Sequence, residues 1–423
     1  MTLKKVRDLT LLLYPLSPGL SRIFSLAPAH FKGKKKWASG SRFVSLNWSE
    51  YPVVCQVWIY KLFSHGWVTR RRSIMTRLGW IISVVSVAFL TATPISAQSR
   101  AAGTGPLSGG FSWVVGSPVL TPVDPPNDKR FSVKDPTIVK FEGNWHLFYT
   151  VRSKKRSHQI EYITFKEWKD ADAAQRHVLD LSDGYYCAPQ VFYFAPHKHW
   201  YLIYQVVEPS RKPALQPAYS RTTDITDPNS WTKSVLLFTK NPGNVKMWID
   251  FWVICDDVRA YLFFTSLNGR MWRSETKLAG FPHAWSRPTV ALTADIFEAS
   301  HTYSLKGSDK YLTIIEAEAP PVPGIGRRRY YKAYSADRLD GFWQPLAATR
   351  EKPFASPVNV KDEGEHWTDS FSHGELLRSG YDQTLQVKPA QLGLLFQGVT
   401  DEKKRGKKYG EIPWRLGILE PIE

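Results

Sequence analysis

Three carboxylic side chains stand at matching places in repeated stretches of this sequence. Asp135 opens the stretch DPTIVKF, Asp250 opens DFWVICD, and Glu298 opens EASHTYSL. Hydrolysis of a sugar–oxygen bond needs one carboxylic acid to protonate the leaving group and one carboxylate to activate water or attack directly. A third acid nearby can raise the pKa of the first by like-charge proximity. These residues make glycoside hydrolysis the first chemistry to consider.

Other chemistries have no matching motif. The sequence contains no HExxH or CxxC arrangement for a metal, no GxSxG turn for a serine nucleophile, and no Gly-rich phosphate loop. Its 17 Trp, 19 Tyr and 22 Phe residues can serve as flat platforms for sugars, although most must form the core. The pattern therefore favours a carbohydrate substrate over a nucleotide.

The three acids belong to a larger repeat of hairpins. Each copy opens with a polar residue, continues as an apolar β-rich run, turns, and resumes with an aromatic residue such as Trp145 or Trp200. The openers are Asp135, Gln190, Asp250, Glu298 and, in a looser copy, His373 with Glu375. They recur at intervals of 55, 60, 48 and 75 residues.

Repeats of this length with several strands each are typical of β-propellers. Five copies predict an all-β fold, a five-bladed β-propeller. Equivalent positions in a propeller face one central axis, so the polar openers should converge there. The alternative is that a polar residue merely starts each strand after a loop.

Net charge is concentrated at the front of the chain. The whole sequence carries +18, but residues 1–97 hold 14 basic and two acidic residues, a net charge of +12. The remaining +6 does not indicate a nucleic-acid-binding protein, so we expect no nucleic-acid partner.

The front segment contains the pattern of an export signal. Residues 75–97 begin with Met75, carry Arg77 early, continue as an apolar run over 78–92, and end in small residues at Ala97. We interpret them as a secretory signal peptide, because the run is short for a membrane span; a signal anchor is the alternative. The protein is then extracellular, without stable membrane association.

This interpretation divides the chain into four parts. Residues 1–74 are a misannotated or disordered extension, with a genuine basic arm as the alternative, and residues 75–97 are the signal peptide. Residues 98–110 are a flexible lead-in, and residues 111–423 form the catalytic propeller. Two cysteines, Cys187 and Cys255, fall after the signal, and the sequence leaves open whether they pair.

Five blocks of the sequence resemble one enzyme family. They are KDPTIVKFEGNWHLFYT, APQVFYFAPHKHWYLIYQ, MWIDFWVICDD, FEASHTYSL and SHGELLRSGYDQTL. In this order and spacing, from about Phe111 to Gly398, they resemble family 62 glycoside hydrolases, the α-L-arabinofuranosidases. The resemblance implies a five-bladed propeller that releases arabinofuranosyl side chains from arabinoxylan with inversion. It also implies that no cofactor is required for the chemistry, and we expect a monomer.

The resemblance also assigns roles to individual residues. It implies that Asp135 is the general base, Glu298 the general acid, and Asp250 the acid that tunes and orients Glu298. We keep Glu375 as a rival for the acid, because it too follows a polar opener.

Further residues are assigned to substrate or metal by the same resemblance. It implies substrate contacts for Lys134, Trp248, Ile249, Gln190 and Phe396. Phe396 stands where we expect Tyr, which would remove a hydroxyl from the sugar site. Gln190 and His373 match the region near the axis where related enzymes hold calcium, so His373 is expected to be an axial metal ligand or to hold a water.

Three segments depart from the resemblance. Residues 207–220 and 316–336 look like loops that shape the cleft, and 327–329 are three consecutive arginines. The charged run at 401–410 is expected to be a solvated tail, with contact to an acidic polysaccharide as the alternative. Competing functions are a β-xylosidase or arabinanase on a related propeller, and a non-catalytic carbohydrate-binding propeller.

Overall fold

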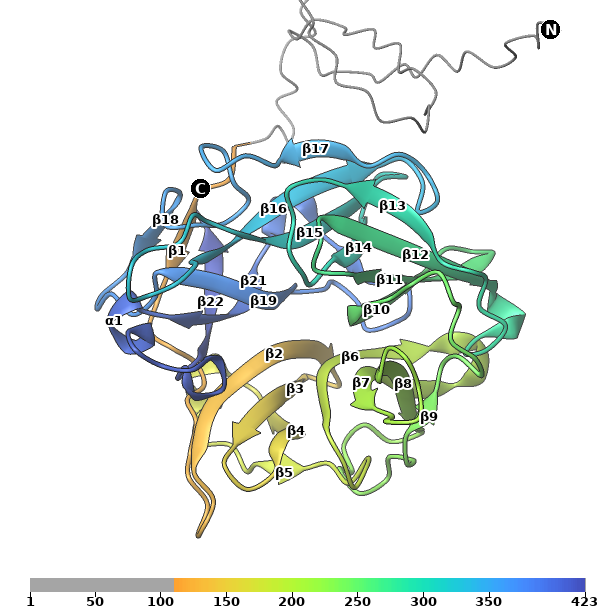
Figure 1. Ribbon diagram of the computed structural model, residues 1–423, viewed down its shortest axis with the longest axis horizontal. Coiled ribbons are helices and arrows are strands. Elements are labelled where there is room, and N and C mark those ends of the chain that lie inside the picture. The colour runs from red at the N-terminus through yellow and green to blue at the C-terminus, as the bar shows by residue number, and fades with distance from the viewer. Residues whose placement is uncertain (1–109, 423) are drawn as a thin grey trace, which may run out of the picture. The chain divides into compact units, whose positions relative to one another are not determined.

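Five β-sheets make up the part of the chain that the computed structural model describes, residues 110–422 (Figure 1). Each sheet has four or five strands, and together they form a five-bladed β-propeller, which confirms the predicted fold. The predicted extension at 1–74, the signal peptide and all of the lead-in except Gly110 lie outside the described residues. Within residues 110–422, no helix is long and apolar enough to cross a membrane.

The blades follow one another along the chain. Blade I contains β2 (Arg130–Phe141), β3 (Asn144–Ser153), β4 (Ser157–Phe165) and β5 (His177–Val178). Blade II contains β6 (Tyr186–Phe194), β7 (His199–Val207), β8 (Leu215–Thr222) and β9 (Val235–Leu236). Blade III contains β10 (Ile249–Cys255), β11 (Arg259–Thr265), β12 (Arg270–Lys277) and β13 (Thr289–Thr293).

The last two blades share segments. Blade IV contains β14 (His301–Leu305), β15 (Tyr311–Glu318), β16 (Arg329–Ala336), β17 (Gln344–Ala347) and the short β20 (Gln386–Val387). Blade V contains β19 (Ser370–Leu376), β21 (Leu394–Val399), β22 (Arg415–Pro421), β1 (Trp113–Val115) and β18 (Val360–Asp362). The helical turns are η1 (Trp168–Asp170), η2 (Ala195–His197), η3 (Leu278–Gly280), η4 (Pro389–Gln391), α1 (Asp401–Lys404) and η5 (Tyr409–Glu411).

Blade V closes the ring by pairing the two ends of the described chain. Strand β1 pairs antiparallel with β22 and parallel with β18, so orange and blue strands lie together in Figure 1. Trp113 is buried, its indole N–H donates to the carbonyl of Phe354 at 2.5 Å, and the two rings stack edge to face. The strand that precedes the first blade thus completes the last one, which closes the ring by strand pairing.

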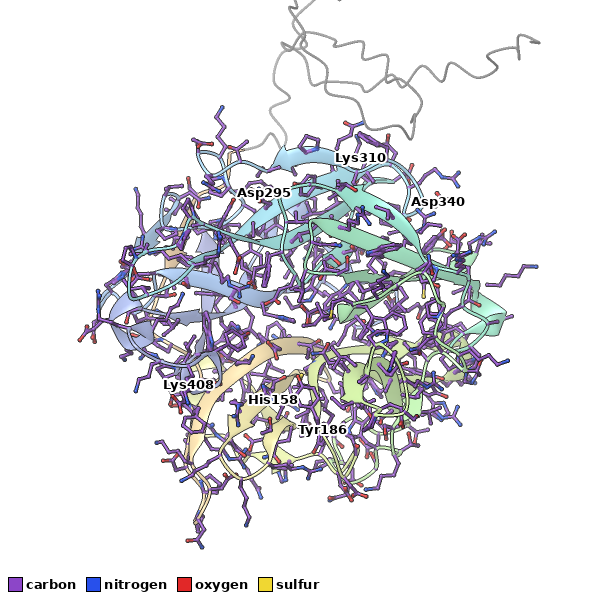
Figure 2. The ribbon with its side chains drawn as sticks, in the orientation of Figure 1. His158, Tyr186, Asp295, Lys310, Asp340 and Lys408 are labelled. Atoms are coloured by element: carbon purple, nitrogen blue, oxygen red, sulfur yellow. The ribbon has the colours of Figure 1, made fainter. Side chains whose placement is uncertain are left out.

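The first strand of each blade lies innermost, and these strands are joined by side chains. Both ends of the Gln190 amide bond to the backbone of Val253 on β10, each at 2.7 Å. Thr137 on β2 donates its hydroxyl to Glu375 on β19 at 2.5 Å. Such contacts bring β2, β6, β10 and β19 side by side around one axis. Large side chains fill the space between the sheets (Figure 2).

Every blade has one non-glycine residue in the left-handed backbone region, at or just before its innermost strand. These residues are Asp135 (φ 48°), Ala188 (52°), Asp250 (58°), Ala299 (53°) and His373 (25°). In four blades the strand register shifts at this point. Such a conformation costs about 1–3 kcal/mol per residue and persists only where surrounding contacts impose it.

This repeated position corrects the alignment of the sequence repeat. Asp135, Asp250 and His373 are equivalent, as predicted. Gln190 lies two residues after the equivalent Ala188, and Glu298 lies one residue before the equivalent Ala299. The predicted equivalence of these two openers is therefore wrong, because the hydrophobic pattern locates a strand without locating its bulge.

Candidate active site

Asp135 is a buried carboxylate held by positive charge. Its Oδ1 lies 3.9 Å from Lys134 Nζ and 3.5 Å from His373 Nδ1. Burial raises the pKa of Asp135, but Lys134, His373 and a hydrogen bond from Thr150 outweigh it, so the net pKa is below the usual value. Asp135 is therefore ionised at neutral pH.

Asp250 lies on the other side of His373. Its Oδ2 lies 3.9 Å from His373 Nδ1 and accepts a hydrogen bond from the Ala299 N–H at 3.1 Å. Burial raises its pKa to about 6; His373 opposes this shift, while Asp135 and Glu316 add to it. Asp250 is thus fixed in orientation by the backbone of the next blade.

Glu298 has the opposite ionisation behaviour from Asp135. It precedes β14, is 9% exposed, and its Oε1 lies 3.3 Å from Arg329 Nη1. Burial, and then the nearby carboxylates Glu316 and Asp250, raise its pKa well above the usual value, although Arg329 opposes them. These surroundings therefore favour the protonated form of Glu298.

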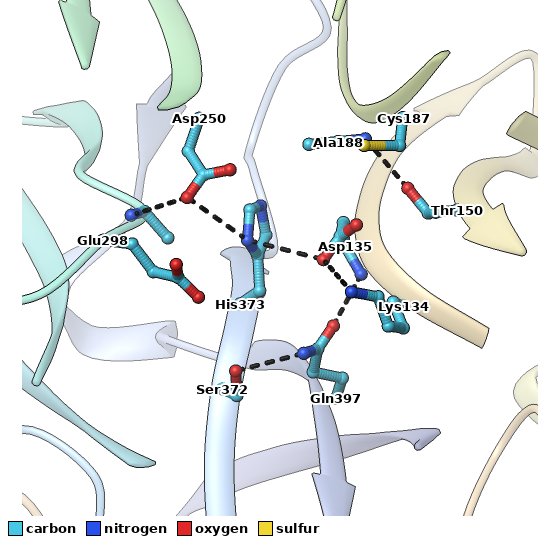
Figure 3. A network of polar contacts seen from close by, with 12 residues as sticks. Lys134, Asp135, Thr150, Cys187, Ala188, Asp250, Glu298, Ser372, His373 and Gln397 are labelled. Carbon is cyan, nitrogen blue, oxygen red and sulfur yellow. Dashed lines mark hydrogen bonds and ion pairs between the residues drawn. The ribbon is translucent and has the colours of Figure 1, made fainter. Parts of the chain in front are cut away.

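The three acids come from three blades and surround one position on the axis. Figure 3 shows His373 between Asp135 and Asp250, with the Glu298 carboxyl beside them. A carboxyl group whose surroundings favour the ionised form and one whose surroundings favour the protonated form are thus held in one site, an arrangement that suits general acid–base catalysis. The predicted grouping of Asp135, Asp250 and Glu298 is what the structure contains.

Side chains one residue before the left-handed position form a second ring. They are Lys134, Cys187, Ile249, Glu298 and Ser372. Lys134 and Ile249, both predicted to contact substrate, therefore stand at positions equivalent to Glu298. The ammonium of Lys134 also lies 5.1 Å from the ring centre of Tyr409.

Three predicted substrate contacts are placed elsewhere. The Gln190 amide is fully buried and committed to Val253. Phe396 is fully buried and stacks between Phe371 and Trp367. These two residues hold blades and core together, so a lost hydroxyl at Phe396 does not alter the sugar site.

Trp248 also belongs to the core. It is fully buried, packs on Phe251 and Phe264, and donates its indole N–H to the Leu215 carbonyl. The sequence block that contains Trp248 mixes core residues with site residues, so resemblance over the block does not place each of its side chains in the site.

The side chains of residues 110–422 do not by themselves supply a calcium site at the axis. Calcium takes six to eight oxygen ligands. Among residues 110–422, no group of three or more His, Cys, Asp and Glu side chains is arranged to hold a metal. The Gln190 oxygen is occupied by Val253, and His373 presents an imidazole nitrogen to two carboxylates. His373 is thus a link between two acids, and its expected role as an axial metal ligand or water holder stays a prediction.

Glu375, the rival proton donor, has a structural place. It is fully buried, accepts from Thr137 and from the Ile138 N–H, and pairs with Arg378 at 2.5 Å. One oxygen accepts hydrogen bonds from the neighbouring blade and the other pairs with Arg378, so this carboxyl group joins blades together and does not face the site.

Sequence reasoning missed two charged groups beside Glu298. Arg329 begins β16 and Glu316 lies within β15, although both fall in the segment 316–336 that looked like a cleft loop. The three arginines at 327–329 were the sequence feature that could have indicated a charged neighbour of the site. Of these three, only Arg329 lies beside Glu298.

The segment at 401–410 was predicted to be a solvated tail; residues 402, 403 and 405–409 are exposed, but Asp401 and Lys404 anchor the segment to the propeller. Asp401 accepts two hydrogen bonds from Arg328, at 2.6 and 2.9 Å, and Lys404 donates to the carbonyl of Arg327 at 2.6 Å. The segment therefore packs against the β15–β16 connection and carries Tyr409 to Lys134. Cys187 and Cys255 are both buried and unpaired, which answers the question of their pairing.

Comparison with known proteins gives one consistent result. The profile of glycosyl hydrolase family 62 matches residues 120–420. Alpha-L-arabinofuranosidase C of Cellvibrio japonicus is 36% identical over 315 residues, which cover 73% of this chain and 46% of that protein. The chain thus spans about half the length of this curated relative.

Solved structures agree with this match. The catalytic domain of a family 62 α-L-arabinofuranosidase from Coprinopsis cinerea has 35% identity and a TM-score of 0.66, covering 74% of this chain and 98% of that one. An α-L-arabinofuranosidase from Podospora anserina, solved with cellotriose, gives the same values. A family 62 hydrolase solved with xylotriose has 34% identity and a TM-score of 0.67, covering 75% of this chain and 99% of that one. With these matches extending over nearly all of the described blades, the chain belongs to glycosyl hydrolase family 62.

Proposed function

We propose that this chain is a secreted, inverting α-L-arabinofuranosidase that removes arabinofuranosyl side chains from arabinoxylan. The observation that carries the proposal is the pair of buried carboxyl groups in one site, Asp135 beside Lys134 and His373 and Glu298 beside Arg329, whose surroundings lower the pKa of Asp135 and raise that of Glu298. The activity named for the relatives and the xylotriose bound to one of them support this substrate class.

The proposed reaction uses water and needs no cofactor. Asp135 takes a proton from a water molecule as the water oxygen attacks the anomeric carbon. The bond from that carbon to the xylan oxygen breaks, and Glu298 gives its proton to the departing oxygen. Attack from the face opposite the leaving group yields the β-anomer of arabinofuranose. Such a pathway needs about 6.5–9.5 Å between the two carboxyl groups, to leave room for water.

Substitution of each acid tests the roles separately. Asp135→Ala and Glu298→Ala should each stay folded and lose about 10²–10⁴-fold in activity on arabinoxylan. Glu298→Ala should lose much less on an aryl arabinofuranoside with a good leaving group, because that group departs without a proton. Asp135→Ala should lose both activities equally, because every substrate needs the water.

Product analysis tests the stereochemistry and the polymer. Proton NMR during the first turnovers should show β-arabinofuranose before mutarotation, and initial α-product would exclude inversion. Release of arabinose from arabinoxylan should exceed release from arabinan; the reverse preference would make the arabinanase alternative correct.

Secretion is a separate part of the proposal and rests on the signal-like residues 75–97. N-terminal sequencing of protein recovered from the medium should begin near Gln98. A secreted product that retains residues 1–74 would contradict it.

A further inference from the structure

Arg329 is a largely buried guanidinium that faces three carboxyl groups. Its Nη1 lies 2.5 Å from Glu316 Oε1 and 3.3 Å from Glu298 Oε1, and its Nε lies 3.3 Å from Glu318 Oε1. Its central carbon lies 4.0 Å from the ring centre of Phe297. Ion pairs on its edge and an aromatic ring on its face fix the guanidinium beside Glu298.

Glu316 connects Arg329 to the opposite side of the site. It is fully buried, and its Oε2 accepts from Ser372 Oγ at 2.7 Å and from the His373 N–H at 2.8 Å. His373 in turn stands between Asp135 and Asp250. One carboxylate therefore touches both the residue that links the aspartates and the arginine beside Glu298.

The backbone contact made by Glu316 does not need a charge. In three other blades the left-handed residue donates its N–H to a neutral side chain on the second strand of the preceding blade: Thr150, Gln205 or Gln397, at 2.8–3.2 Å. Glu316 occupies the corresponding place for His373. Since Thr or Gln is sufficient elsewhere, the negative charge at Glu316 has a function other than holding the strand.

We propose that Glu316 and Arg329 are a positioning pair for Glu298. Arg329 holds the Glu298 carboxyl in the orientation for proton delivery, and the charge of Glu316 keeps the proton on Glu298 until the leaving oxygen takes it. This inference rests on the proposed function, in which Glu298 is the proton donor.

The electrostatic surroundings of Glu298 agree with these roles. After burial, Glu316 is the charge that raises the pKa of Glu298 most, followed by Asp250, whereas Arg329 and Lys134 lower it. The titratable and charged groups facing Glu298 from packed elements are Glu316 on β15, Arg329 and Tyr331 on β16, Asp250 on β10, Lys134 on β2 and Tyr409 on η5.

Glu316→Gln tests the charge while keeping an acceptor for Ser372 and His373. Removing a negative neighbour lowers the pKa of Glu298, so the alkaline limb of the kcat/KM profile should move to lower pH by about one unit. At neutral pH, activity on arabinoxylan should fall about tenfold or more, while activity on an aryl arabinofuranoside with a good leaving group changes little. An unshifted limb with equal losses on both substrates would show a merely structural role and overturn the proposal.

Arg329→Lys tests the orientation while keeping the positive charge. A lysine cannot reproduce the planar guanidinium contacts, so kcat on arabinoxylan should fall more than kcat on the aryl substrate, with the alkaline limb nearly unshifted. Equal losses on both substrates would contradict the orienting role. This variant also keeps the proposal testable if Glu316→Gln does not fold.

Glu375→Gln is the matched control, because Glu375 is an equally buried carboxylate on the blade next to that of Glu316, and it is also paired with an arginine, Arg378. This variant should change thermal stability without moving the alkaline limb. If its alkaline limb moved as far as that of Glu316→Gln, loss of any buried carboxylate would have the same effect, and the proposed role of Glu316 would be contradicted. Glu298→Ala separates the two levels of inference. If the activity loss of Glu298→Ala does not depend on the leaving group, the proposed function fails. If that loss does depend on the leaving group but the alkaline limb of Glu316→Gln does not move, only this inference fails.

Discussion

Asp135 and Glu298 are both buried carboxylic acids, yet their pKa values move in opposite directions. Burial alone would raise both. Lys134 and His373 reverse the effect at Asp135, whereas Glu316 and Asp250 reinforce it at Glu298. The sequence drew attention to the two acids, whose roles stay predictions, but not to their full surroundings, because Glu316 lies within a strand whose apolar pattern hides this buried charge.

Lys134 influences both acids in the same direction, which gives a prediction at this scale. Its positive charge lowers the pKa of Asp135 and of Glu298. Lys134→Met should therefore raise both values and move both limbs of the kcat/KM profile to higher pH. On the acid side, activity then disappears at a higher pH, because Asp135 with a raised pKa becomes protonated at a higher pH.

Lys134→Arg is the control, because it preserves the charge and should leave both limbs nearly in place. The measurement is the position of each limb of the kcat/KM profile on arabinoxylan, whose leaving group needs the Glu298 proton, independent of the absolute rate. Limbs that stay fixed in Lys134→Met would mean that Lys134 does not set these pKa values.

At the scale of elements, the strands were predictable and their bulges were not. Alternation of aromatic and β-branched residues located the hairpins around Asp135, Gln190 and Asp250. The pattern has no marker for the left-handed residue, which is Asp in two blades, Ala in two and His in one. A side chain from the neighbouring blade imposes that conformation, so local sequence cannot report it.

Gly374 shows how closely the inner strand of blade V is packed. A Cβ at this position would overlap the carbonyl oxygen of Leu395 and lie 2.8 Å from the Cα of Phe396. Gly374→Ala should therefore lower the free energy of unfolding by about 1–3 kcal/mol and reduce activity, since His373 is the adjacent residue.

Gly380→Ala is the matched control, because a Cβ there meets no atom within 4 Å. Thermal unfolding of both variants checks the prediction. Equal melting temperatures for the two variants would show that β19 can shift away from β21 without cost.

At the scale of the whole molecule, the propeller depends on strand β1 to complete its last blade. The repeat predicted five blades, but the contribution of Trp113–Val115 to blade V was not visible, because three residues carry no periodic signal. The pairing of β1 with both β18 and β22 is a long-range contact between the two ends of the described chain.

Two truncations test this dependence. A protein that starts at Gln98 should fold and remain active, because it keeps β1. One that starts at Gly116 loses the buried Trp113 and both strand pairings. Its free energy of unfolding should be lower by about 3 kcal/mol or more, or the protein should be insoluble. Equal melting temperatures for the two proteins would show that blade V closes without β1.

The hydrogen bonds at the left-handed residues have a consequence for engineering this ring. The N–H of Asp135 is held by Gln397 of blade V, that of Asp250 by Gln205 of blade II, and that of Ala299 by Asp250 of blade III. Blades I, III and IV thus each carry one of the three acids, while the left-handed residue at or beside each acid is supported by the preceding blade. A blade transplanted from another propeller would bring its own acid intact and misplace the acid next to it. The interchangeable unit of this enzyme is therefore the boundary between two blades and not the blade itself.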